Sequence, residues 1–196
     1  MRYAACNIAL TPYDHVEELR HLPELGLEGL EVAPSRVWRD TWDGLSAAAV
    51  ERYRATVENA GLGIIGLHSL FWDHPGLGLF RDAATRVRTL EFLVHLSKLC
   101  RDLGGRTLIY GSAPARARGA LSPEEASREA IGFFVELCRR IESHGTCYCF
   151  EPLAPEDGDF IHTVGESRAV VEAVDHPALR LQIDAKALVA NDEAES

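Results

Sequence analysis

Short apolar runs alternate along the chain with longer segments in which apolar residues recur at helical spacing. A short apolar run bounded by turn residues is typical of a buried strand, and a period of about 3.6 residues is typical of an amphipathic helix. Six strands are predicted, at residues 3–9, 28–33, 62–68, 106–111, 146–151 and 179–184. Helices are predicted between them, at residues 11–25, 46–60, 82–103, 122–141 and 163–175. This alternation predicts an α/β fold with a parallel sheet.

The helix boundaries carry recognisable start and stop signals. Ser122 and Thr163 each precede a glutamate three residues on, which is the pattern of a capping box, and Gly104 and Gly105 follow a helical stripe. No glycine- and serine-rich linker or low-complexity stretch interrupts the pattern. Residues 1–196 are therefore interpreted as a single domain.

Polar residues recur at the carboxyl ends of the predicted strands. They are Asn7, Glu31, His68, Ser112, Glu151 and Asp184. In a closed barrel such positions converge on one face, whereas an open doubly wound sheet has one crevice. No GxGxxG motif follows the first strand, which also disfavours a dinucleotide-binding sheet. The pattern predicts a (β/α)8 TIM-barrel type of fold, with only about six strands in this chain and hence a C-terminally incomplete barrel.

Glu151 and Asp184 follow apolar strand segments on consecutive strands. Because side chains alternate along a strand, Cys147, Cys149 and Glu151 are expected on one face, with Tyr148 and Phe150 on the other. A carboxylate on a covered sheet face needs a cation or hydrogen-bond donors to offset its desolvation. The pair therefore predicts a metal site or a proton-transfer site.

Composition narrows the class of protein. The 196 residues are 46% hydrophobic, enough for a real core, and no segment approaches the roughly 18 apolar residues of a membrane span. The net charge of -10 disfavours a general nucleic-acid partner. The five cysteines show no CxxC spacing and are interpreted mainly as reduced core residues, and the N-terminus shows no signal-peptide pattern. The expectation is a cytoplasmic protein with neither a nucleic-acid nor a membrane partner.

Several short motifs, in order along the chain, resemble those of the xylose isomerase-like TIM barrels, in particular the sugar phosphate isomerase/epimerase group. They are Gly29-Leu30-Glu31-Val32-Ala33-Pro34, Gly66-Leu67-His68, Gly104-Gly105 through Tyr110-Gly111-Ser112 to Arg116, Phe150-Glu151-Pro152-Leu153, Asp159-Phe160-Ile161 with Thr163, and Asp184-Ala185-Lys186-Ala187. Each motif is weak alone, and together they are fairly specific for the superfamily. They specify a substrate far less well.

The resemblance implies a divalent metal such as Mg2+ or Mn2+ held by four ligands. Glu151 and Asp184 match the first two, and the strands that carry the other two are not present in this chain. It also implies that Glu151 is a general base that moves a proton next to a carbonyl through an enediolate. Ala187 stands where ketose epimerases usually carry a histidine, which disfavours a close ketose epimerase.

Four further residues are candidate substrate ligands. They are His68, Glu31, Lys186 and Arg116. An arginine can hold a phosphate or carboxylate, and Arg118 is a rival to Arg116 for that contact. Lys186 is as well explained by an ion pair with Asp184. Phe71 and Trp72 follow His68 and are candidates for the wall of a substrate pocket.

The leading hypothesis is a metal-dependent sugar or sugar-phosphate isomerase/epimerase of carbohydrate metabolism, with a small carbohydrate as substrate. Three alternatives stay open: a dehydratase or lyase of the same superfamily, a truncated barrel that binds a small molecule without catalysis, and an apurinic endonuclease. The acidic charge and the lack of extra histidines disfavour the endonuclease. Exposed sheet edges in an open barrel also predict a possible homo-oligomer.

Overall fold

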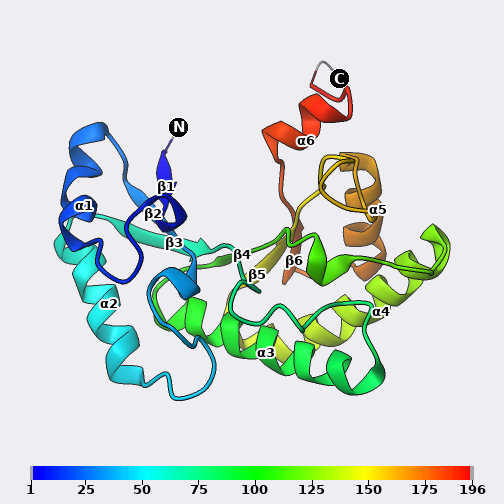
Figure 1. The fold of residues 1–196 in the computed structure, drawn as a ribbon, viewed down its shortest axis with the longest axis horizontal. Helices are drawn as coiled ribbons and strands as arrows, with labels where there is room; N and C mark the ends of the chain where they lie inside the picture. The colour runs from blue at the N-terminus through cyan, green and yellow to red at the C-terminus, as the bar shows by residue number, and fades with distance from the viewer. Residues whose placement is uncertain (1, 195–196) are drawn as a thin grey trace.

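Six parallel strands form one continuous sheet in a computed structural model that describes residues 2–194. Their order in the sheet is the order in the chain, as Figure 1 shows. The strands are β1 (Ala4–Cys6), β2 (Gly29–Val32), β3 (Gly63–Leu67), β4 (Thr107–Tyr110), β5 (Cys147–Phe150) and β6 (Leu179–Leu181). All six predicted strands and the α/β barrel-type fold are confirmed.

A helix follows each strand. The α-helices are α1 (Val16–His21), α2 (Ala47–Asn59), α3 (Ala83–Asp102), α4 (Pro123–Ile141), α5 (Val164–Val174) and α6 (Ala185–Ala190). In Figure 1, α2, α3, α4 and α5 succeed one another around the outside of the curved sheet. The two predicted capping boxes are present at Ser122 and Thr163. This arrangement leaves the opposite face of the sheet free to carry polar groups.

The alternation predicted for β5 is confirmed by its packing. The Tyr148 hydroxyl donates a hydrogen bond to the Leu93 carbonyl oxygen on α3, 2.6 Å away, and the Phe150 ring packs on Phe134 of α4. Both aromatic residues are fully buried on the helix side. Cys149 on the opposite face is close enough to Glu31 for the charge of that carboxylate to raise the pKa of its thiol. The apolar core thus lies between sheet and helices, and the other face collects the polar side chains.

The sheet is open within the part of the chain that the structure describes. There, β1 pairs only with β2, and β6 pairs only with β5. Ile65, on the face away from the helices, is 44% exposed, as expected for an incompletely covered interior. The six strands form an arc of a barrel.

Two strands end three residues before their predicted ends, whereas the other four are one residue shorter than predicted at each end. β1 ends at Cys6, so the predicted strand 3–9 is too long, and Asn7 begins a short 3-10 turn. β6 ends at Leu181, whereas the prediction extended it to Asp184. The reason is that the Asp184 carboxylate accepts hydrogen bonds from the main-chain nitrogens of Lys186 and Ala187 and starts α6, which the prediction missed. The apolar alternation in the sequence continues beyond Leu181, the last residue of β6 that pairs with β5.

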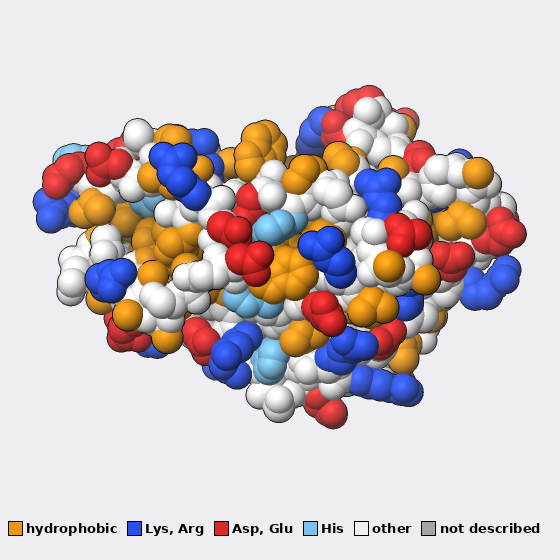
Figure 2. Space-filling view, turned by 60° about the horizontal axis from the view of Figure 1, so that its bottom comes forward, with side chains coloured by type: hydrophobic (Ala, Val, Ile, Leu, Met, Phe, Trp, Pro, Cys, Tyr) orange, Lys and Arg blue, Asp and Glu red, His pale blue; other side chains and the backbone are white. Residues whose placement is uncertain are grey.

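Acidic and basic side chains are interspersed on the face that Figure 2 shows. Among the described residues of that face no continuous basic patch is visible, in line with the net charge of -10. Within residues 2–194, no helix combines the length and the apolar character needed to cross a membrane.

Candidate active site

Glu151 directly follows β5, as predicted. Its main-chain nitrogen donates a hydrogen bond to the Tyr110 carbonyl oxygen, 3.3 Å away, which ties it to the end of β4. Its carboxylate lies over Gly111, where an added Cβ would sit 1.8 Å from Glu151 Oε2. Only glycine leaves room for the carboxylate at this position, so the site depends on Gly111 as much as on Glu151.

The environment of Glu151 favours the protonated carboxyl. Burial raises its pKa most, the charges of Asp184 and Glu31 raise it further, and the Arg116 guanidinium opposes them. The resulting pKa of about 7 is well above that of an ordinary glutamate. A group with a pKa near neutrality can both accept and return a proton, as an acid–base catalyst must.

Asp184 is half-buried and lies close enough to Glu151 for its charge to be felt there. The structure corrects its predicted place: it is the N-cap of α6, three residues beyond β6. Both of its oxygens accept main-chain hydrogen bonds, at 3.1 Å from Lys186 N and 3.3 Å from Ala187 N. The helix start therefore fixes the orientation of this carboxylate.

Lys186 contacts neither Glu151 nor Asp184 through its ammonium group. Its Nζ lies 2.5 Å from Asp157 Oδ2 and 3.7 Å from Glu156 Oε1, and more than half of its side chain is exposed. The interpretation of Lys186 as the ion-pair partner of Asp184 is therefore wrong. Its role as a substrate ligand stays a prediction, which these exposed contacts do not favour.

Arg116 is only 1% exposed, and its guanidinium is turned toward the protein interior. Nη1 donates to the Glu151 carbonyl oxygen at 2.5 Å, and Nη2 donates to the Ile161 carbonyl oxygen at 3.4 Å. The cationic group also stacks over the Phe150 ring at 5.2 Å. These are the contacts of a structural arginine, so the predicted phosphate contact through Arg116 is not favoured. Arg118 donates to Asp159 and Leu121 carbonyl oxygens instead.

Glu31 and His68 come together at the ends of β2 and β3, and Cys6 joins them from β1. One ligand atom of each lies within 4.8 Å of the other two. Burial raises the pKa of Glu31, and the charge of His68 opposes this effect. The prediction missed Cys6 because it chose Asn7 as the polar residue of this strand, and the Asn7 side chain is instead buried and bonded to Ala33. The register pair Cys6–Glu31 would have revealed it.

Of these three residues, His68 reaches a cavity of about 450 Å3. His68, Phe71, Trp72, Gly111 and Ser112 are among the residues that line it. The predicted pocket wall of Phe71 and Trp72 is therefore present. Gly111, which lines the cavity, also lies under the Glu151 carboxylate.

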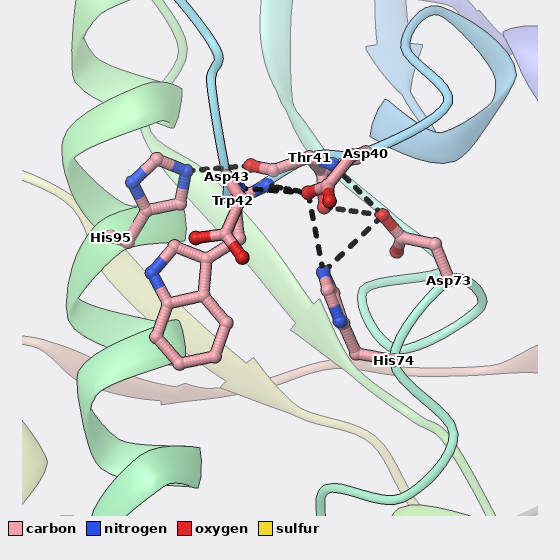
Figure 3. Close-up of polar contacts among 7 residues, drawn as sticks. All are labelled: Asp40, Thr41, Trp42, Asp43, Asp73, His74 and His95. Atoms are coloured by element: carbon pink, nitrogen blue, oxygen red, sulfur yellow. Dashed lines mark hydrogen bonds and ion pairs between the residues drawn. The ribbon is translucent and has the colours of Figure 1, made fainter.

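A cluster of Asp40, Asp73 and His74, drawn in Figure 3, joins two loops that follow neighbouring strands. His74 Nε2 lies 3.5 Å from Asp73 Oδ2 and 3.9 Å from Asp40 Oδ1. Asp73 Oδ2 also accepts hydrogen bonds from the Thr41 hydroxyl, at 2.7 Å, and from the Thr41 main-chain nitrogen, at 3.0 Å. The cluster ties the loop after β2 to the cavity-lining loop after β3.

Sequence comparison defines the class: the model of the xylose isomerase-like TIM barrel family matches residues 19–196. The chain belongs to this family. No curated protein matches it in sequence.

Solved structures share the fold. D-psicose 3-epimerase from Clostridium cellulolyticum H10 superposes with a TM-score of 0.80 at 16% identity, over 99% of this chain and 67% of that one. The 3-keto-D-glucoside 4-epimerase YcjR from E. coli gives 0.77 at 17% identity, over 100% and 72%. An IOLI protein described with a bound zinc atom gives 0.74 at 14% identity, over 99% and 66%. This chain thus spans about two thirds of the length of these structures, and the likeness concerns the fold.

Proposed function

We propose that the chain carries the proton-transfer half of a metal-dependent sugar or sugar-phosphate isomerase/epimerase. The observation that carries the proposal is Glu151, a carboxyl with a pKa of about 7 that lies over the cavity-lining Gly111 and in the field of a second carboxylate, Asp184. The similarity to the fold of sugar epimerases supports the same class.

The carboxylates of Glu151 and Asp184 are suitable ligands for a divalent cation. Among the described residues no donor hydrogen-bonds to the Glu151 carboxylate, and Asp184 raises its pKa by repulsion. Carboxylate oxygens are the ligands that a hard ion such as Mg2+ or Mn2+ prefers, and Glu151 and Asp184 would supply two of the four ligands that the family resemblance implies. When bound, the ion would neutralise negative charge that develops on the substrate oxygens.

Residues of the chain itself would carry out the proton transfer and hold the substrate. Glu151 removes a proton from the carbon next to the substrate carbonyl, and the electron pair of that bond moves onto the carbonyl oxygen to give an enediolate. Return of the proton by Glu151 to the neighbouring carbon would isomerise the sugar. Inversion of the same centre would require a second acid on the opposite face of the enediolate, because Glu151 reaches one face only. His68, on the cavity wall, would hydrogen-bond a substrate hydroxyl, with Glu31 beside it.

The cavity supports a small carbohydrate as substrate. At about 450 Å3 it is within the usual range for a small-molecule site. Its wall combines the polar side chains of His68 and Ser112 with the apolar faces of Phe71 and Trp72. Such a mixed wall suits a sugar ring, which has apolar faces and hydroxyl edges.

Solvent deuterium exchange tests the proposal directly. The chain is incubated with D-psicose, D-tagatose or a ketopentose phosphate in deuterated water with Mn2+, and NMR follows the carbon-bound protons next to the carbonyl. We expect exchange with the wild type and a loss of at least about 100-fold in Glu151→Gln. Glu156→Gln, on an exposed loop, is the matched control and should exchange normally. Equal exchange in Glu151→Gln would exclude Glu151 as the base.

The same experiment separates the alternatives. A probable 3-DHS dehydratase shares the fold, with a TM-score of 0.67, and a dehydratase would release water from the substrate and change its mass. A barrel that only binds sugars would show ligand-induced shifts without exchange. A homo-oligomer stays a prediction, for which the measurement is size-exclusion chromatography with light scattering.

A further inference from the structure

Three potential metal ligands of different chemistry converge at the ends of β1, β2 and β3. Cys6 and Glu31 are register partners in the β1–β2 ladder. The His68 main-chain nitrogen donates to the Val32 carbonyl oxygen at 2.9 Å and continues the ladder to the third strand. As a result, a sulfur, a carboxylate oxygen and the imidazole nitrogen of His68 all lie within 4.8 Å of one another.

The spacing of these atoms agrees with tetrahedral zinc coordination. Zinc binds sulfur at about 2.3 Å and imidazole nitrogen at about 2.0 Å, so two such ligands at a tetrahedral angle lie about 3.6 Å apart. Cys6 Sγ and His68 Nδ1 lie 3.6 Å apart. A thiol–imidazole hydrogen bond would explain this one distance, but it gives no partner to Glu31.

Glu31 is half-buried, and among the described residues no donor hydrogen-bonds to its carboxylate. The Cys6 thiol is likewise half-buried and lies beside this carboxylate as its register partner. Two acidic groups that face each other in a poorly solvated place are what a divalent cation stabilises, with release of the thiol proton.

The scaffold holds the ligands in place before any ion arrives. Asn7 is fully buried next to Cys6, and its Oδ1 accepts a hydrogen bond from the Ala33 main-chain nitrogen at 2.6 Å. Its Nδ2 donates back to the Ala33 carbonyl oxygen at 3.4 Å, so the ends of β1 and β2 are clamped together. Of the three ligands, His68 also lines the cavity, so the cavity reaches the His68 side of the cluster.

We propose that Cys6, Glu31 and His68 form a zinc site, with the fourth coordination position open to the cavity. A thiolate and an imidazole select a borderline or soft ion over Mg2+ or Mn2+, so this site differs in chemistry from the oxygen pair of Glu151 and Asp184. The open position is the arrangement of a catalytic zinc site rather than of a structural one. The inference stands independently of the proposed isomerase chemistry.

Cobalt is the spectroscopic probe. The chain is stripped of metal with a chelator, titrated with Co2+ and followed by absorption. We expect a thiolate-to-cobalt charge-transfer band, together with visible bands of tetrahedral intensity, and displacement of both by Zn2+. A spectrum without the thiolate band would overturn the proposal.

Alkylation of the wild-type chain provides a second readout that needs no variant. Zn2+ should slow the reaction of Cys6 with iodoacetamide by at least about tenfold, because a coordinated thiolate is masked. Cys147, outside the cluster, is the internal control and should react equally with and without Zn2+. Equal alkylation of Cys6 in both conditions would show that the thiol and imidazole form only a hydrogen bond.

Variants locate the ligand. Cys6→Ser should remove the thiolate band and weaken zinc binding, measured by competition with a chromophoric chelator, by at least about tenfold. Cys149→Ala tests the other thiol near Glu31, and Glu151→Gln removes the oxygen pair; both should keep the band. A band that survives in Cys6→Ser but disappears in Cys149→Ala would assign the thiolate elsewhere and overturn the proposal. Loss of sugar exchange in Glu151→Gln with an intact band would leave the zinc site standing on its own.

Discussion

Arg116 lies beneath the candidate catalytic residue Glu151 and donates a hydrogen bond from Nη1 to its main-chain carbonyl oxygen. The same guanidinium reaches the Ile161 carbonyl oxygen, so one buried cation connects the end of β5 to the loop that precedes α5. Its buried position costs desolvation, which lowers its own pKa to about 10. We interpret Arg116 as a positioning residue for Glu151.

Removal of this arginine should therefore affect the fold. Arg116→Met leaves the Glu151 carbonyl oxygen without its donor, whereas the Ile161 carbonyl oxygen keeps a hydrogen bond from the Leu153 main-chain nitrogen. Because the stacking on Phe150 is lost as well, we expect the free energy of unfolding to fall by about 1–3 kcal/mol in urea denaturation. Arg88→Met, on the exposed side of α3, is the control and should stay within about 0.5 kcal/mol of the wild type. Unchanged stability combined with a raised KM would instead support the substrate contact predicted from the sequence.

Gly111→Ala should impair the candidate site while the protein stays folded. The new Cβ would lie 1.8 Å from Glu151 Oε2, which is the end of a flexible side chain, so the carboxylate must turn away. We expect a loss of at least about tenfold in deuterium exchange, with only about 1 kcal/mol lost in stability.

A matched control lies on α4. The Cβ of Gly132→Ala would meet nothing within 4 Å, and this variant should be neutral or slightly more stable. The opposite extreme is Gly66→Ala, whose Cβ would lie 2.2 Å from the Thr107 carbonyl oxygen and should prevent folding. Normal exchange in Gly111→Ala would show that the carboxylate position is not critical.

The sequence predicts the alternation of strands and helices well because buried positions recur at the period of a strand or of a helix. The two faces of β5 follow from simple alternation, and Glu151 is located correctly because its strand ends where the apolar pattern ends. The same reasoning fails at Asp184, where a side chain that caps a helix stops the strand although the apolar alternation continues. Local hydrogen bonds of this kind leave little trace in a hydrophobic pattern.

Long-range contacts explain the other gaps in the prediction. An arginine has the same charge whether it binds a ligand or stabilises the fold, so the sequence does not separate the two roles. The structure does, because Arg116 is 1% exposed and donates to the Glu151 carbonyl oxygen. Lys186 forms an ion pair with Asp157, which lies in a loop whose path the sequence pattern does not specify. Cys6 is brought to His68 across two strand pairings, a relationship that depends on register.

The Glu151 pKa of about 7 predicts a pH-dependent stability in the metal-free protein. The unfolded carboxyl titrates near pH 4.3, so the folded state holds its proton more tightly. The stabilising contribution of this group is complete below about pH 4.3 and is lost as the pH rises through about 7. Relative to Glu151→Gln, the wild type should lose roughly 1–2 kcal/mol between these limits, after allowance for solvent screening.

Urea denaturation at a series of pH values in the presence of a chelator measures this difference. Other titrating groups are shared by the two proteins and cancel in the comparison. A stability difference that is constant from pH 4 to about pH 8 would contradict a raised pKa at Glu151.

The loop after β2 should depend on Asp73, whose Oδ2 accepts both hydrogen bonds from Thr41 (Figure 3). Thr41 is 1% exposed, so Asp73→Ala leaves its nitrogen and hydroxyl without a partner in a buried place. We expect a loss of about 1–3 kcal/mol and a change in the fluorescence of Trp72 on the neighbouring cavity wall. Asp43→Ala, an exposed carboxylate in the same loop, is the control and should change neither measurement.

Cys147 should be the most reactive thiol of the metal-free chain. The neighbouring Cys149 thiol favours the Cys147 thiolate, and together with the charge of Arg180 it lowers the pKa of Cys147 to about 7. Burial instead raises the pKa of Cys100 to about 12 and that of Cys138 to about 11. Because the thiolate is the nucleophile, iodoacetamide at neutral pH should modify Cys147 first, as peptide mass spectrometry would show.

The cause of this reactivity is tested by removal of the Cys149 thiol. Cys149→Ala should slow the alkylation of Cys147 by about tenfold or more, since most of that thiol would then be protonated at neutral pH. Cys6→Ala, which leaves the Cys147–Cys149 pair intact, is the control and should keep the rate. An unchanged rate in Cys149→Ala would mean that exposure alone sets the reactivity of Cys147, and that the two thiols on the inner face of β5 do not interact.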